Sequence, residues 1–386
     1  MSWKLAATAA FGLEPVVGRE LRAMGYEPQV DTGVVRFVGG PADVVRANLW
    51  LRCADRVLIE LGTFPAATFD QLFEGTKTLP WEEWLAQDVV FPVEGWCVRS
   101  TLMSVSDCQS IVKKAVVERL KGHYNINWFP ETGPTYRIRF GILKDEVTLY
   151  LDTSGHGLHK RGYRPLNAMA PLHETLGAGL VYLSRWFSGA RPVMVEGQPI
   201  QRPPQPLWDP CCGSGTIPIE AALIAKNAAP GLQARFEAEG WRQVEATLWQ
   251  QQRQEAKAGE KAFAEPVIFA TDIDEAAVAL TRKHAGNAGV AHMLHIQRQA
   301  LRDLRTDLPK GVLITNPPYG QRMGDQQEAE ALYRQIAQKA KEIPGWSTHI
   351  ITPHQQFERI YGKRADKRTK VYNGGMACQY YSYYVK

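Results

Sequence analysis

The sequence has no long hydrophobic run and few cysteines. No stretch approaches the roughly 18 apolar residues of a membrane span, and the N-terminus lacks the apolar core of a signal peptide. The six cysteines show neither CxxC pairs nor regular spacing, so neither a zinc site nor a disulfide framework is indicated. These absences predict a soluble, cytoplasmic protein with reduced thiols and no metal. The cysteines are Cys53, Cys97, Cys108, Cys211, Cys212 and Cys378.

A large excess of charge of one sign is also missing. The net charge is +5 and the isoelectric point is near 8.8. This mildly basic balance is compatible with a nucleic-acid partner but does not establish one. The 386 residues are enough for two or three domains with ample cores.

The first 152 residues have the pattern of two small α/β modules. Residues 4–64 alternate as strand, helix, two strands, helix and strand, which is a split β-α-β unit. In residues 68–152 we expect short helices around Trp81 and Trp84, a basic helix over 106–121 capped by Ser106, and two strands joined by a tight turn. Those strands cover 135–140 and 146–151.

The sequence changes character between Asp152 and Tyr163, where we place the main boundary. A helix over 172–186 and a Pro- and Gly-rich connector over 188–206 follow. Strands and helices then alternate, which predicts a doubly wound, largely parallel sheet that binds ligands at the carboxyl ends of its strands. The Gln-, Glu- and Lys-rich segment 237–261 is expected to be a solvated helical arm that covers one face, not a functional element. The alternating elements are strands near Leu207 and over 267–270, 295–298 and 311–315, and helices over 217–225 and 275–286.

Two motifs fall at the predicted strand ends. Asp209-Pro-Cys-Cys-Gly-Ser-Gly-Thr216 follows a strand and opens a helix, and Gly213 and Gly215 would let the backbone pass close to a ligand. A glycine pair alone is weak evidence, because any tight strand-to-helix turn can contain one. The second motif has Asp272 directly at a strand end, where an acidic residue accepts hydrogen bonds from ribose, while Asp274 fits a helix N-cap.

A third motif, Asn316-Pro317-Pro318-Tyr319, follows the apolar run 311–315. The Asn316 side-chain oxygen and the Pro317 carbonyl can both accept hydrogen bonds from a planar amino group, and the Tyr319 ring offers it a stacking face. The alternative is a stiff strand-to-loop turn, since Asn-Pro favours turn initiation. The tetrapeptide alone does not decide between these interpretations.

The three motifs together resemble the class I S-adenosylmethionine-dependent methyltransferases of the branch that methylates amines. The resemblance implies S-adenosylmethionine as cofactor, bound by Asp209, Gly213, Gly215 and Asp272, with Ile273 against the adenine. Residues 170–175, which include Leu172, match the segment that closes over the methionine end of the donor. Asn316, Pro317 and Tyr319 would be catalytic. Where relatives often hold the adenine amino group with an Asp, this chain has Gln299-Ala300, so that contact is in doubt.

Basic residues gather in candidate RNA-contacting segments. They lie on the helix over 106–121, in the loop over 159–164 and in the C-terminal loop over 363–370. Charge runs are often only solvated faces, and the two loop arginines could instead clamp the linker. The candidate RNA-binding residues are Lys113, Lys114, Lys121, Arg161, Arg164, Lys363, Arg364, Lys367, Arg368 and Lys370.

The C-terminal basic loop, Val371-Tyr-Asn-Gly374 and the segment 155–164 make the chain similar to one family over nearly its whole length. This family is the bacterial RlmL-type THUMP-domain 23S rRNA guanine-N2 methyltransferases. The resemblance implies a ferredoxin-like module over 1–64, a THUMP module over 65–155 and a Rossmann-like methyltransferase domain with a seven-stranded, mostly parallel sheet over 156–386. The expected partner is 23S rRNA or a large-subunit assembly intermediate.

Three alternatives remain open. A tRNA guanine-N2 methyltransferase of the same architecture would share the cofactor and amine motifs. A DNA adenine-N6 methyltransferase also uses Asn-Pro-Pro-Tyr, but no DNA target-recognition domain is evident. A non-catalytic RNA-binding assembly factor could keep the fold, although the intact motifs argue against it.

Overall fold

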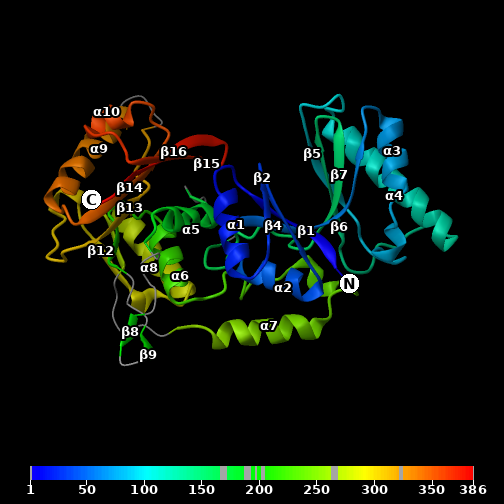
Figure 1. Cartoon of the computed structure of the whole chain (residues 1–386), viewed down its shortest axis with the longest axis horizontal. Helices are drawn as coiled ribbons and strands as arrows, with labels where there is room; N and C mark the ends of the chain where they lie inside the picture. The colour runs from blue at the N-terminus through cyan, green and yellow to red at the C-terminus, as the bar shows by residue number, and fades with distance from the viewer. Residues whose placement is uncertain are drawn as a thin grey trace. The chain divides into compact units, whose positions relative to one another are not determined.

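The computed structural model describes residues 2–165, 172–186, 193–195, 198–200, 205–261, 268–320 and 325–385. The chain packs as two units (Figure 1). The first comprises Met1–Ala9, Gly18–Leu158 and Ala234–Glu255, and the second comprises Ala10–Val17, His159–Gln233 and Ala256–Lys386. The predicted division at residues 64 and 155 stays a prediction. No helix among the described residues is long and apolar enough to cross a membrane.

A seven-stranded sheet organises the first unit, in the order β2-β3-β1-β4-β7-β6-β5. Adjacent strands in this sheet are antiparallel, except that β5 and β6 are parallel to each other. The strands are β1 (Trp3–Ala9), β2 (Gln29–Asp31), β3 (Val34–Gly39), β4 (Ala54–Pro65), β5 (Val93–Val98), β6 (Arg137–Leu143) and β7 (Glu146–Asp152). The helical elements are α1 (Glu14–Ala23), α2 (Pro41–Trp50), α3 (Phe69–Lys77), η1 (Trp81–Glu83), α4 (Val105–Tyr124), η2 (Glu237–Gly240) and α7 (Ala246–Ala258). Of these, α1 begins and α7 ends in residues of the second unit.

The order of elements in residues 4–64 is the predicted one, but the next module differs in two places. Helix α3 was not predicted; Thr68 caps it by accepting a hydrogen bond from the Gln71 N–H at 3.2 Å. Only one 3₁₀ turn, at Trp81–Glu83, forms where two short helices were expected. Ser104, not Ser106, caps α4, so the helix begins at Val105.

The expected solvated arm, residues 237–261, packs largely within the first unit. The Trp241 ring stacks on Tyr136 with centroids 4.4 Å apart and planes 9° apart, and its indole N–H donates to the Thr135 carbonyl at 2.7 Å. Trp241 and Trp249 are both buried. The predicted arm therefore lies against one face of the unit through these two buried rings, while most residues of α7 are exposed.

The second unit contains the predicted doubly wound sheet, in the order β12-β11-β10-β13-β14-β16-β15. The first five strands in that order are parallel, whereas β16 and β15 complete the sheet in antiparallel pairs. The strands are β10 (Leu207–Asp209), β11 (Ile268–Asp272), β12 (Leu294–Arg298), β13 (Gly311–Thr315), β14 (Trp346–Thr352), β15 (Lys367–Asn373) and β16 (Met376–Tyr383). A separate hairpin joins β8 (Val193–Val195) to β9 (Gln198–Ile200).

Helices connect these strands; the first three were predicted from the sequence and the last two were not. They are α5 (Glu174–Leu183), α6 (Thr216–Ala225), α8 (Glu275–Asn287), α9 (Asp325–Glu342) and α10 (Phe357–Tyr361), with 3₁₀ turns η3 (Ala291–Met293) and η4 (Leu301–Asp303). Most of the predicted connector 188–206, together with residues 170, 171 and 267 of two predicted segments, lies outside the described residues. The sheet order reverses at β10, which pairs with β11 on one side and β13 on the other. This switch point is where a ligand is expected.

Candidate active site

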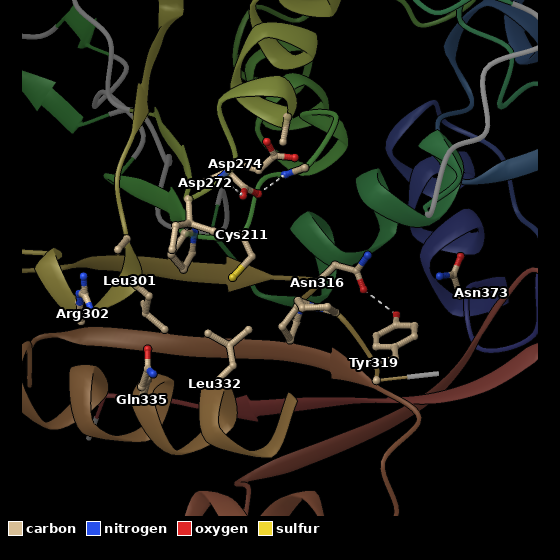
Figure 2. A pocket seen from close by; sticks show the side chains of 18 of the residues that line it. Cys211, Asp272, Asp274, Leu301, Arg302, Asn316, Tyr319, Leu332, Gln335 and Asn373 are labelled. Atoms are coloured by element: carbon tan, nitrogen blue, oxygen red, sulfur yellow. Dashed lines mark hydrogen bonds between the residues drawn. The ribbon is translucent and has the colours of Figure 1, made fainter. Parts of the chain in front are cut away.

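A cavity of about 900 Å³ opens at the carboxyl ends of β10, β11 and β13 in the second unit (Figure 2). The turn after β10 contributes Cys211 and Gly213, the end of β11 contributes Asp272 and Ile273, and the segment after β13 contributes residues 316–320. All three sequence motifs therefore contribute residues to one cavity. Its other lining residues include His173, Ala300, Leu301, Arg302, Leu332, Gln335, Asn373, Gly374 and Met376.

The glycine turn is joined directly to the acidic strand end. Gly213 has φ +54°, and a Cβ placed on it would meet nothing within 4 Å, so its backbone faces open space. Its N–H donates to Asp272 Oδ2 at 2.9 Å, and Asp272 Oδ1 accepts the N–H of Asp274 at 3.0 Å. These bonds fix the Asp272 carboxylate at the cavity wall, and each oxygen has a further lone pair for a ligand hydroxyl.

Asp274 has the role predicted for it. It caps α8 by accepting the Ala276 N–H at 2.9 Å. Between the two acids Ile273 is 64% exposed and lines the cavity. An apolar side chain that stays exposed beside a carboxylate can cover the flat face of an adenine.

Asp209, Gly215 and Leu172 are not among the residues that line the cavity in the described part of the chain. Asp209 lies behind the glycine turn, where Oδ1 accepts the Cys211 N–H at 3.2 Å. Burial raises the pKa of Asp209 to about 7, an effect that the Cys211 N–H opposes. Gly215, with φ +84°, is the N-cap of α6. Direct contact of these three residues with the donor stays a prediction.

The segment after β13 has a defined side-chain arrangement. The Tyr319 hydroxyl donates to Asn316 Oδ1 at 2.5 Å, as the dashed line in Figure 2 shows. Burial raises the pKa of Tyr319 far above its ordinary value, with the Cys378 thiol acting in the same direction. Tyr319 is therefore a neutral phenol at physiological pH, and it holds the acceptor oxygen of Asn316 toward the cavity.

The comparisons with known proteins identify the family. Residues 161–382 match the model described as RMKL-like, methyltransferase domain. The chain belongs to this methyltransferase family. Residues 4–58 match the RlmL ferredoxin-like domain and residues 66–152 match the THUMP domain. The predicted fold and family are therefore confirmed.

Individual relatives support the same assignment. The chain is 43% identical to the Bacillus subtilis protein named "Putative RNA methyltransferase YpsC", over 100% of this chain and 96% of that one. It is 34% identical to the ribosomal RNA large subunit methyltransferase K/L of Syntrophotalea carbinolica, over 97% of this chain and 53% of that protein. The chain thus spans about half the length of that K/L relative.

A solved structure relates the fold to the cofactor. It is titled SMU.472, "a putative methyltransferase complexed with SAH", is 37% identical and has a TM-score of 0.90 over 100% of this chain and 98% of that one. SAH, S-adenosylhomocysteine, is what remains of S-adenosylmethionine after methyl transfer. S-adenosylmethionine as the family's methyl donor, predicted from the sequence, is confirmed.

Several residues of the methyltransferase cavity were missed at the sequence level. Leu332 and Gln335 come from α9, Asn373 is the last residue of β15, and Gly374 lies in the turn that follows it. Only Asn373-Gly374 had a sequence signal, because it ends the C-terminal segment on which the family resemblance rested. Gln299 does not line the cavity; its amide donates to the Asp303 carbonyl at 3.1 Å, and residues 300–302 form that wall.

The predicted RNA-binding residues differ in their availability. Arg161 forms an ion pair with Glu220 at 3.5 Å, and Arg164 forms one with Glu174 at 3.5 Å. The side chains of both arginines are at least nine-tenths buried. This burial favours the alternative in which they clamp the linker over the one in which they contact RNA phosphates.

On α4 the candidate lysines have partners of their own. Lys113 pairs with Glu131 at 2.8 Å and lies over the Phe91 ring, Lys121 pairs with Glu118 at 3.2 Å, and Lys114 lies near the Phe73 ring. The C-terminal candidates Lys363, Arg364, Lys367, Arg368 and Lys370 are exposed. From Lys367 onward they lie on β15 at the sheet edge, not in the predicted loop.

Proposed function

We propose that the chain transfers a methyl group from S-adenosylmethionine to the exocyclic N2 of a guanosine in 23S rRNA. The observation that carries the proposal is the placement of Asn316, Pro317 and Tyr319 in the same cavity as Gly213 and Asp272. Methyl transfer from a nucleoside donor to a nucleoside amine requires two groups in one cavity. One is a set of hydrogen-bond acceptors for the target amine, and the other is a carboxylate that binds the ribose of the donor.

The cavity residues fit the donor. The Asp272 oxygens would accept hydrogen bonds from the ribose hydroxyls, Ile273 would cover the adenine, and the open side of Gly213 would leave room for the methionine part. When bound, the donor supplies a methyl group that its sulfonium charge already activates. The protein therefore has to orient the two partners and exclude competing geometries, and orientation alone can lower a barrier by roughly 7 to 11 kcal/mol.

The amine would be held by Asn316 and Pro317. Asn316 Oδ1 and the Pro317 carbonyl would each accept a hydrogen bond from one of the two N–H groups of the amine. These hydrogen bonds would draw the N–H groups out of the ring plane and ease rehybridisation of the nitrogen. Oδ1 already accepts the Tyr319 hydroxyl but keeps a second lone pair for the amine. The Tyr319 ring stacks on the base. No general base is needed before transfer, because the proton can leave to water afterwards.

RNA as the substrate class is supported by the THUMP match over residues 66–152 and by relatives named as RNA methyltransferases. The narrower choice of guanine N2 in 23S rRNA rests on the family resemblance and on the names of the K/L relatives. A base inside structured RNA must first be unstacked, which costs a few kcal/mol. Stacking on Tyr319, worth about 1 to 3 kcal/mol, would offset part of that cost.

The decisive experiment measures methyl transfer from labelled S-adenosylmethionine into deproteinised 23S rRNA and, separately, into total tRNA. The products are digested and separated as nucleosides. Label in N2-methylguanosine from rRNA is the expected result.

Other outcomes would each overturn part of the proposal. Label in N2-methylguanosine from tRNA alone would move the substrate to tRNA. Label in N6-methyladenosine would replace the target base. If neither RNA is labelled, parallel incubation with assembling large subunits distinguishes a requirement for proteins from an absence of RNA methylation.

A further inference from the structure

A second cavity, of about 610 Å³, lies within the first unit on one face of its sheet. In β4, Val57 and Ile59 belong to the buried core, whereas Arg56 and Leu58 line the cavity. In β6, Ile138 and Phe140 are likewise core residues and Arg139 lines the cavity. Because side chains alternate along a strand, the cavity lies on the sheet face opposite that main core.

The floor and one wall of this cavity are apolar and aromatic. Ala6, Leu58 and Tyr150 form a small buried cluster of their own. The Trp96 ring is nearly parallel to Tyr150, with planes 16° and centroids 6.5 Å apart, and Trp96 is 40% exposed. A Cβ on Gly141 would come within 2.5 Å of the Trp96 ring, so the absence of a side chain at 141 lets the indole lie flat on the sheet.

Three arginines surround this aromatic surface. Arg36 pairs with Glu60 at 3.0 Å and with Asp31 at 2.7 Å, and Arg56 pairs with the fully buried Asp152 at 2.7 Å. Arg139 pairs with the same Asp152 at 2.7 Å. These carboxylates fix the guanidinium planes, while a guanidinium has five N–H donors and can serve a further acceptor.

The charge balance distinguishes two kinds of RNA contact. A surface that grips duplex phosphates needs a net positive charge, but here Asp31, Glu60, Glu94 and Asp152 largely neutralise the arginines. Fixed guanidinium forks beside the exposed face of Trp96 instead suit a planar, polar ligand that stacks and accepts hydrogen bonds along its edge. The volume lies within the roughly 300 to 1,000 Å³ range of small-ligand pockets.

We propose that this cavity binds one unpaired nucleotide of the RNA substrate, with the base on Trp96 and its edge toward Arg36 and Arg139. The proposal rests on the RNA-modifying function proposed above, but it concerns a different unit of the chain from the methyltransferase cavity. Through this cavity the first unit would recognise a single-stranded element of the RNA, in addition to any contact with the backbone of folded RNA.

The test measures fluorescence anisotropy of a labelled single-stranded RNA and of the matched duplex with the full chain. Trp96→Ala should weaken binding of the single strand by roughly 5- to 150-fold and leave the duplex little changed. Trp96→Phe, which keeps an aromatic face, should recover part of the loss. Arg139→Gln should weaken the single strand in the same selective way.

Trp128→Ala is the matched control, because Trp128 is 79% exposed and does not line the cavity. Its affinity for both RNAs should equal that of the unchanged chain. Thermal unfolding of each variant shows whether the fold is kept. For any variant that unfolds early, photocrosslinking of the unchanged chain to a 4-thiouridine RNA gives the second readout, with crosslinks expected in β5 or β6.

Equal binding of the single strand by Trp96→Ala and the unchanged chain would overturn the proposal, as would crosslinks confined to other segments. An equal loss for single strand and duplex would do so too, since it would indicate a backbone contact. None of these readouts depends on methyl transfer. A chain that binds the single strand through Trp96 but methylates no RNA would refute only the proposed function.

Discussion

The side-chain oxygen of Asn316 is the atom on which the proposed amine cradle depends most. Replacing Asn316 with Ala removes this acceptor, and loss of one such positioned group typically lowers turnover by about 100- to 1,000-fold. Donor affinity should stay nearly unchanged, since the predicted donor contacts lie at Gly213 and Asp272. Single-turnover methyl transfer and calorimetric donor binding measure the two effects.

Two control variants sharpen this test. Asn316→Asp keeps an acceptor oxygen and should retain far more activity than Asn316→Ala. Tyr319→Phe keeps the stacking ring and loses only the hydroxyl that donates to Asn316 at 2.5 Å. Full activity in Asn316→Ala would show that the oxygen does not hold the amine.

Asp209, behind the glycine turn, makes the stability of the chain depend on pH. Its pKa in the folded chain is about 7, raised by burial from the ordinary value of 3.8. A raised carboxyl pKa contributes stability that is fully present below about 4 and lost as the pH rises through 7, up to roughly 4 kcal/mol. Asp209→Asn, which cannot ionise, should therefore gain stability over the unchanged chain as the pH rises.

Thermal unfolding at acidic and mildly alkaline pH tests this expectation. The difference in melting temperature between Asp209→Asn and the unchanged chain should be more positive at the higher pH. An equal difference at both values would mean that folding does not raise the pKa of Asp209.

At the scale of elements, the turn from β10 into α6 contains two glycines with different roles, one in folding and one in donor binding. Gly215 has φ +84°, and a Cβ on it would meet Thr281 Cγ2 at 2.8 Å, so Gly215→Ala should destabilise the chain by about 1 to 3 kcal/mol. Gly213→Ala is the matched comparison, because its Cβ would enter open space. Compared with Gly215→Ala, Gly213→Ala should lower the stability of the chain less and its affinity for the donor more.

Urea unfolding and donor titration of both variants give the comparison. If the two alanines had the same effect on stability and on donor affinity, the distinction between a packing glycine and a cavity-facing glycine would be wrong.

The exposed basic residues on and before β15 are the remaining candidates for phosphate binding in the second unit. Removal of one lysine that binds a phosphate should lower the slope of log affinity against log salt by about 1. We expect this for Lys363→Gln and Lys367→Gln, but less for Arg368→Gln, because Arg368 already pairs with Glu358. Lys310→Gln, at an exposed position outside this segment, is the control, and RNA affinity across a salt series is the measurement.

An unchanged slope in both lysine variants would remove β15 from the RNA surface.

The elements themselves were largely predictable, since the strands that carry the motifs have short apolar runs and glycine turns. Helix α3 was missed because it is only nine residues long and its N-cap at Thr68 was not recognised.

At the scale of the whole molecule, the third segment of the first unit, Ala234–Glu255, lies in sequence between β10 and β11. Trp241 is the anchor of this segment, buried against Tyr136. Trp241→Ala should therefore destabilise the first unit by about 3 to 5 kcal/mol, while donor binding in the second unit is retained below the transition.

Denaturant unfolding and donor titration test this expectation together. The exposed Trp128 again provides a control, since Trp128→Ala should change stability by no more than about 0.5 kcal/mol. A neutral Trp241→Ala would show that the buried indole does not anchor this segment.

The sequence by itself determined the motifs and the strand ends at which they lie. Asp272 and Asn316 could be placed at one sheet edge because parallel strands carry their carboxyl ends to the same side. Their local neighbours, such as the Asp274 cap, also follow from nearby residues. These features depend on short stretches of chain, which is why periodicity and turn chemistry reveal them.

The tertiary structure alone decided which distant groups meet. It brings Gln335 and Asn373 to the methyltransferase cavity, buries Arg161 against Glu220, and lays Trp96 over Gly141. Whether a charged or aromatic side chain is buried, paired or open to a ligand depends on contacts between residues far apart in the chain. A one-dimensional pattern does not contain those contacts, so burial and partnership were settled only by folding.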